Sequence, residues 1–214
     1  MFFHFHRQIS SPADFAARWP SAVPEQDTGI YIVTSSCSTL PGYLIRARAR
    51  MKFWNRYSGD RYSHVSIALD IRLTNMFSFA RKELHNPLDS GLIREDIRTG
   101  VFAFHPNSDW IAVFRLPVDP EQYRDICRRV DRDWSRRNQL HYNFRGLFSM
   151  LLVGRGVYHK DHYICSQWVA ELLVQSGIRL FEGKRPQDVR PFDFYSVLDR
   201  FKLFEGPLQE YPLY

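Results

Sequence analysis

The chain has 214 residues, of which 44% are hydrophobic and 15% aromatic. This size and apolar content suit one globular domain with a single sizeable core, and we find no internal repeat or low-complexity tract. The formal net charge is +6, which invites a nucleic-acid or anionic-surface partner. The arginines are scattered, however, and no motif for binding RNA or DNA accompanies them, so we expect no nucleic-acid partner.

In chain order, residues 1–27 are interpreted as an N-terminal extension with a short helix over 11–19, and residues 28–214 as one domain. Patterns of apolar and β-branched residues predict strands over 28–36, 63–70, 75–82, 100–105, 110–118 and 201–208. Capping residues and apolar spacing predict helices over 42–54, 121–138, 143–153, 165–176 and 192–200. Asp119 is the predicted cap at the start of the second of these helices, and Gly177 is the predicted residue just after the end of the fourth. Residues 83–99 are interpreted as a long loop. This order predicts an α+β fold with an antiparallel sheet packed against helices.

The predicted strand over 63–70 carries a histidine on a polar face. Alternation places His64, Ser66, Ala68 and Asp70 on one side of the strand. The opposite side is entirely apolar, so we expect it to face the core. A rigid strand would hold the His64 ring in one direction, as a general base requires. A surface or structural histidine is the competing interpretation.

The predicted helix over 165–176 begins with a cysteine. Unpaired N–H groups and the positive end of the dipole at a helix N-terminus favour the thiolate form, which is the nucleophile. Cys165 therefore suits nucleophilic catalysis with a histidine base. Free cysteines are also commonly just small buried apolar residues, and that alternative stays open from these residues alone.

The two segments Ser-His-Val-Ser-Ile-Ala-Leu-Asp around His64 and Tyr-Ile-Cys-Ser-Gln-Trp-Val-Ala around Cys165 resemble the signature motifs of the NlpC/P60 superfamily of papain-like hydrolases. The order, histidine before cysteine, is similar to its circularly permuted branch, which includes the YiiX/YebB-like proteins and the lecithin retinol acyltransferase-like enzymes. The resemblance covers roughly residues 28–210. It implies a permuted papain-like core and a catalytic domain over 28–214 that forms acyl-enzymes on an amide, ester or thioester.

This resemblance also implies a third, polar residue that orients the histidine. No acid or amide occupies the expected place on the strand after His64, and Ser78 is the nearest polar match. For the oxyanion we expect the backbone N–H of Cys165, with Tyr31, Thr34 or Ser35 of the first strand as a second donor. Tyr163 and Gln167, which lie close to Cys165 in the chain, are candidate substrate contacts.

The predicted function is a cysteine hydrolase that cleaves an amide or peptide-like bond in a peptide or lipid substrate, with no cofactor. A lipid-dependent thiol acyltransferase and an inactive binding module of the same fold are the alternatives. His159, His162 and Cys165 have a spacing that suggests zinc, but a fourth ligand is not obvious and we expect no metal. The apolar segment 146–157 is interpreted as a core helix, with a membrane-surface helix as the alternative.

The three cysteines, Cys37, Cys127 and Cys165, are odd in number and widely spaced, which favours a reducing compartment. The N-terminal residues show no secretory signal, and no apolar run is long enough to span a membrane. We therefore expect a cytoplasmic protein.

Overall fold

The computed structural model describes residues 29–36, 62–82, 89–98 and 110–212. Three expected elements, the helices over 11–19 and 42–54 and the strand over 100–105, lie outside the described residues, as does Cys37. The described part is α+β, with a six-stranded antiparallel sheet and four α-helices. This agrees with the fold class expected from the sequence.

The sheet has the strand order β4-β3-β2-β1-β5-β8, and every neighbouring pair is antiparallel. Its strands are β1 (Gly29–Ser35), β2 (His64–Ala68), β3 (Met76–Arg81), β4 (Ser90–Glu95), β5 (Trp110–Pro117) and β8 (Lys202–Pro207). Two further short strands, β6 (His141–Tyr142) and β7 (His162–Tyr163), form a parallel pair. Five of the six sheet strands coincide with predicted strands to within a few residues.

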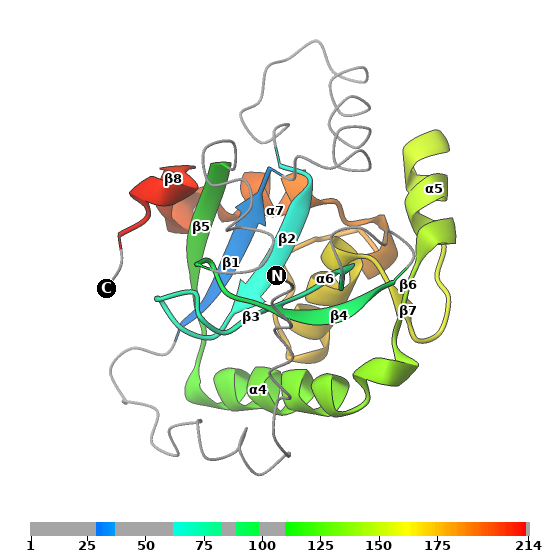
Figure 1. Ribbon diagram of the computed structural model, residues 1–214, viewed down its shortest axis with the longest axis horizontal. Coiled ribbons are helices and arrows are strands. Elements are labelled where there is room, and N and C mark those ends of the chain that lie inside the picture. Colours follow the sequence, from blue (N-terminus) through cyan, green and yellow to red (C-terminus); the bar gives the residue numbers. More distant parts are fainter. Residues whose placement is uncertain (1–28, 37–61, 83–88, 99–109, 213–214) are drawn as a thin grey trace, which may run out of the picture.

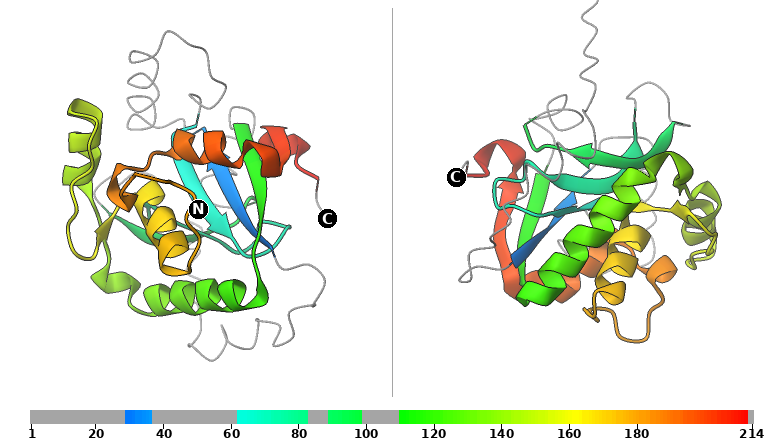
Figure 2. Two further views of the ribbon diagram at one scale, coloured as in Figure 1. Left: turned by 180° about the vertical axis from the view of Figure 1, so that it is seen from behind. Right: turned by 90° about the horizontal axis from the view of Figure 1, so that it is seen from below.

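Helices cover one face of the sheet (Figure 1). The α-helices are α4 (Pro120–Ser135), α5 (Phe144–Leu152), α6 (Cys165–Gln175) and α7 (Pro191–Leu198). Short 3-10 turns occupy Arg137–Gln139, Pro186–Asp188, Asp199–Phe201 and Leu208–Glu210. Seen from behind in Figure 2 (left), α6 and α7 lie over the strands, α4 runs below them, and α5 stands at the edge of the molecule.

The main core lies between this sheet face and the helices, as the alternation in β2 predicts. Val65 and Ile67 of β2 are fully buried there with Trp168 and Val169 of α6. A second apolar cluster lies on the other face, where Ala68 of β2 packs with residues of β1, β3 and β5. Both faces of the central strands are therefore fixed by packing, which sets the register of the strand that carries His64.

Local signals explain where the helices begin and end. Asp119 caps α4 by accepting a hydrogen bond from the Gln122 N–H at 2.7 Å, and the Asp119 N–H donates in turn to the Gln122 Oε1 at 3.1 Å. Gly177 follows α6 with a φ of +79°, a left-handed conformation that glycine adopts without a Cβ penalty. Both features were predicted from the sequence.

The prediction of a loop over 83–99 is wrong for its second half. Residues Ser90–Glu95 form β4, which pairs along its whole length with β3. In this register Glu95 lies opposite Met76, at the end of β3 that follows the turn from β2. The error matters because β4 carries a residue of the site described below.

The apolar segment 146–157 is only partly a core element. Gly146, Leu147 and Met150 of α5 are buried, whereas Phe148 and Leu152 are 59% and 73% exposed. Of the helices in the described ranges, none combines the length and apolarity needed to cross a bilayer.

Candidate active site

Cys165 is the first residue of α6, as predicted. Ile164, in extended conformation, precedes it and accepts the first helical hydrogen bond from the Trp168 N–H at 3.0 Å. The neighbouring Ser166 hydroxyl donates to the Val189 carbonyl at 2.6 Å, which ties this first turn to the loop before α7. Cys165 is 7% exposed and forms no disulfide. The thiol therefore sits at a helix N-terminus, where backbone N–H groups lack helical partners.

A buried three-residue arrangement orients the His64 ring at the start of β2. Its Nε2 lies 3.3 Å from Glu95 Oε1 and 3.3 Å from the Ser66 hydroxyl. The same hydroxyl donates a 2.6 Å hydrogen bond to Glu95 Oε2. Because the Ser66 proton points to Glu95, its oxygen accepts from Nε2–H. This network places a proton on Nε2, and Nδ1 is the ring nitrogen that neither contact uses.

The charges of the site act on one another. Burial opposes ionisation of His64, but the Glu95 carboxylate and the Cys165 sulfur outweigh it and raise the pKa of His64 well above its ordinary value of 6.5. Burial likewise opposes ionisation of Glu95, yet His64 and Ser66 lower the pKa of that carboxyl. Cys165 is close enough to the ring for its sulfur to act on the pKa of His64, whereas the hydrogen bond to Ser66 and the ion pair with Glu95 both use Nε2.

The residue that lies against the His64 ring is Glu95, whereas Ser78, the residue expected there, forms no hydrogen bond with it. Ser78 is fully buried on β3, two residues beyond the partner of Glu95. Its hydroxyl lies close enough to lower the pKa of Glu95 but forms no regular hydrogen bond. Ser78 thus supports the carboxylate, whereas Glu95 and Ser66 contact the ring directly.

The other predicted residues fall into different places. Ser35 lies opposite His64 in the β1–β2 ladder and is buried, so it remains a neighbour of the site. Thr34 is on the opposite face of β1, and Tyr31 lies opposite Ala68, at the far end of the ladder, in the second apolar cluster. The Tyr163 ring packs on Phe79 at 5.2 Å between centroids.

Gln167 is buried and turns towards α5. Its Oε1 accepts from Nδ2 of Asn143, the N-cap of α5, at 3.4 Å. Its Nε2 has no hydrogen-bond partner among the described residues. Of the five predicted oxyanion or substrate residues, only Ser35 lies beside His64; Tyr31, Thr34, Tyr163 and Gln167 have positions set by packing elsewhere.

A pocket opens directly beside the thiol. Its enclosed space is small, about 50 Å³, and it opens to solvent. Its apolar wall comes from α5, the residue before Cys165 and the start of α7, namely Leu147, Met150, Leu151, Ile164, Pro191 and Phe192. The pocket therefore offers Cys165 an apolar surface on which an acyl group can pack.

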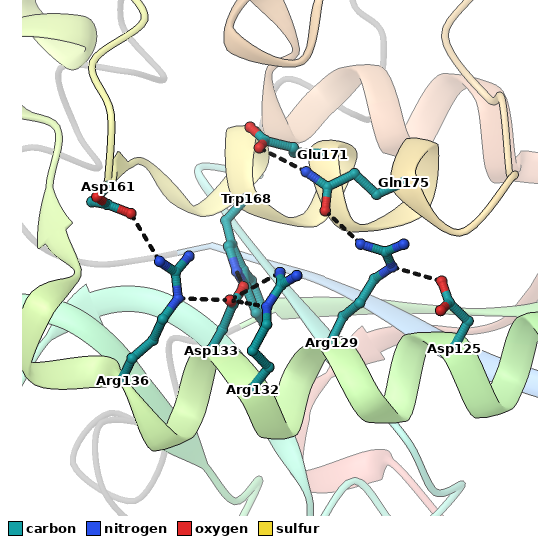
Figure 3. A network of polar contacts seen from close by, with 9 residues as sticks. All are labelled: Asp125, Arg129, Arg132, Asp133, Arg136, Asp161, Trp168, Glu171 and Gln175. Carbon is teal, nitrogen blue, oxygen red and sulfur yellow. Dashed lines mark hydrogen bonds and ion pairs between the residues drawn. The ribbon is translucent and has the colours of Figure 1, made fainter.

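A polar network holds α6 against α4 (Figure 3). The Trp168 indole N–H donates to Asp133 Oδ2 at 3.0 Å, and Arg132 and Arg136 donate to Oδ1 at 3.1 and 3.2 Å. Arg136 also reaches Asp161, in the turn before β7. Since Trp168 is one helical turn from Cys165, the network fixes the position of the helix start.

No cluster of three or more histidine, cysteine or acidic side chains suited to a metal ion occurs among the residues described in the structure. His159 and His162 contact each other through their Nδ1 atoms at 2.8 Å. The sequence matches no model of a known protein family and no curated protein.

Proposed function

We propose that the chain is a cysteine hydrolase with a permuted NlpC/P60-type papain-like core, cleaving an amide or peptide-like bond through an acyl-enzyme on Cys165. The observation that carries this proposal is the His64 ring, held by Glu95 and Ser66 and close enough to Cys165 for the sulfur to raise its pKa. A nucleophile, a base and a residue that orients the base are the parts that such chemistry needs. The histidine-before-cysteine order and the antiparallel sheet are consistent with the permuted branch.

In the first step, His64 Nδ1 takes the thiol proton and the sulfur attacks the substrate carbonyl carbon. The S–C bond forms, and the carbonyl oxygen becomes an oxyanion near the N–H groups at the start of α6. His64 then gives its proton to the leaving nitrogen as the C–N bond breaks. Water, deprotonated by His64, attacks the thioester and releases a carboxylic acid and the free thiol.

A direct test uses N-acyl p-nitroanilides that carry an acetyl, an octanoyl or a dodecanoyl group. We expect p-nitroaniline release and a mass increase equal to the acyl group, mapped to the Cys165 peptide after acid quenching. His64→Ala should slow acylation by about 10²- to 10⁴-fold. Cys127→Ser is a matched control, because Cys127 is a second buried cysteine, on α4, and this variant should still be acylated at Cys165. An adduct that forms equally fast in His64→Ala would refute the proposal.

A lipid-dependent acyltransferase is the second candidate, and the apolar wall of the pocket favours it. It forms the same thioester but passes the acyl group to an amine or alcohol in place of water. Adding a primary amine to the acylated enzyme separates the two: a transferase yields the N-acyl amine, whereas a hydrolase yields mainly the free acid. An inactive binding module would show no adduct, and its thiol reactivity would not depend on His64.

A further inference from the structure

Exposed apolar side chains are concentrated on α5 and the loop that follows it. Among the described residues, eight large apolar side chains are exposed, and five of them lie in this one segment. They are Phe148, Leu152, Val153, Val157 and Tyr158, with exposures between 45% and 73%. Single exposed apolar residues are ordinary on protein surfaces, but a contiguous group marks a binding surface. We call these five residues the α5 patch.

The segment that carries the patch is basic and contains no acid. Arg145, Arg155 and Lys160 are all exposed, and residues 145–160 include neither aspartate nor glutamate. Two carboxylates beside the segment are engaged: Asp161 accepts from Arg136 at 3.0 Å, and Asp188 accepts from Arg185 at 2.8 Å and from the Gly156 N–H at 2.9 Å. The surface around the α5 patch therefore combines apolar side chains with a net positive charge.

Few other elements support α5. It has nine residues and makes only sparse contacts with the other elements. It stands at the edge of the molecule in Figure 1 and in the view from behind in Figure 2. A helix this short is marginal in water unless one of its faces is covered. Its inner face is covered, because Leu147 and Met150 are buried in a cluster with Ile164. Its outer face carries Phe148 and Leu152 of the α5 patch.

We propose that the α5 patch docks on a membrane surface rich in anionic lipids. Interfacial helices bind in this way, with phenylalanine and leucine inserted at the level of the head groups and lysine or arginine paired with lipid phosphates. The same helix separates the lipid from the pocket, so an acyl chain leaving the bilayer would pass along α5 to the thiol. This assignment of the substrate to a lipid surface rests on the proposed function, whereas the docking itself does not.

The test is sedimentation of the full chain with vesicles of phosphatidylcholine alone and of an equimolar mixture with phosphatidylglycerol. We expect binding to the mixed vesicles at least about tenfold tighter than to phosphatidylcholine, with a loss at high salt. Each cation at the interface raises the binding constant by about fivefold, so the double variant Arg145→Glu/Lys160→Glu should bind at least about 25-fold more weakly. Phe148→Ser/Leu152→Ser should lose at least about tenfold through lost insertion.

Two control variants match these changes elsewhere on the surface. Leu203→Ser alters a side chain that is 51% exposed on β8, and Arg124→Glu reverses an exposed charge on α4; both should bind like the unmodified chain. Cys165→Ala should also bind unchanged, so that a failed hydrolase proposal leaves this one standing. Equal binding to both vesicle types, or equal losses in the control variants, would overturn the proposal. So would lipid-free self-association that Leu152→Ser abolishes, because a second copy would then cover the patch.

Discussion

The role of Glu95 can be tested by a single change that keeps the shape of the side chain. Glu95→Gln replaces the carboxylate that faces His64 Nε2 at 3.3 Å with a neutral amide of the same size. The amide oxygen can still accept one hydrogen bond, so the ring keeps a partner. The negative charge that favours the imidazolium is lost, and with it the electrostatic stabilisation that a thiolate–imidazolium pair would receive.

The size of the effect follows from the geometry. Two unit charges at 3.3 Å attract by about 5 kcal/mol at an effective dielectric constant of about 20, before the cost of burying them is subtracted. A hydrogen bond to a charged group contributes about 1.5–3 kcal/mol net. A difference of about 1.4 kcal/mol corresponds to a tenfold change in the population of the reactive thiolate. We therefore expect Cys165 alkylation at about pH 6 to slow by about 10- to 100-fold.

The assay is alkylation by iodoacetamide, followed by mass spectrometry of the Cys165 peptide across a range of pH. Glu182→Gln, a change of an exposed glutamate in the loop after α6, is the matched control and should react like the unmodified chain. Circular dichroism and tryptophan fluorescence establish whether the Glu95→Gln variant is folded. A folded Glu95→Gln protein whose Cys165 reacts within about twofold of the control would refute the role of Glu95.

Three further results are expected. In urea titrations, the free energy of unfolding of the unmodified chain should exceed that of the Glu95→Gln variant by the largest amount between about pH 4.5 and 6.5. The raised pKa of His64 stabilises the fold below the ordinary value of 6.5, and the lowered pKa of Glu95 stabilises it above 4.5. The gain fades as the pH rises through the folded pKa of His64 or falls through that of Glu95, and a pH-independent difference would contradict this account. Asp133→Asn should cost about 1–3 kcal/mol by urea unfolding, because its buried carboxylate joins α4 to α6; an unchanged midpoint would show that the network adds nothing. Gly156→Ala should lower the melting temperature, because a Cβ there would lie 1.7 Å from the Gln187 carbonyl oxygen, whereas Gly183→Ala, where the added Cβ meets nothing, should show only the backbone strain of its positive φ.

Sequence patterns predicted the elements whose signals are local. The alternation around His64 gave the apolar side of β2, because a strand buried on one face must repeat with a period of two. The apolar spacing after Cys165 and the glycine at position 177 gave both ends of α6 to within one residue. Asp119 similarly predicted the start of α4 through its side-chain cap. In each case the residues that define the element are neighbours in the chain.

Glu95 escaped prediction because its position depends on pairing between strands. In β4 the burial pattern does not alternate: Gly91 and Leu92 are buried, Ile93 and Arg94 are partly exposed, and Glu95 is buried again. A segment without alternation that contains a glutamate has the composition of a solvated loop. One signal was nevertheless available, since a structureless loop of 17 residues is uncommon inside a small domain and argues for a hidden strand. β4 is antiparallel to β3 and therefore runs in the same direction as β2. Such a strand can place an acid on the face that carries His64, which is where a group that orients the base is needed.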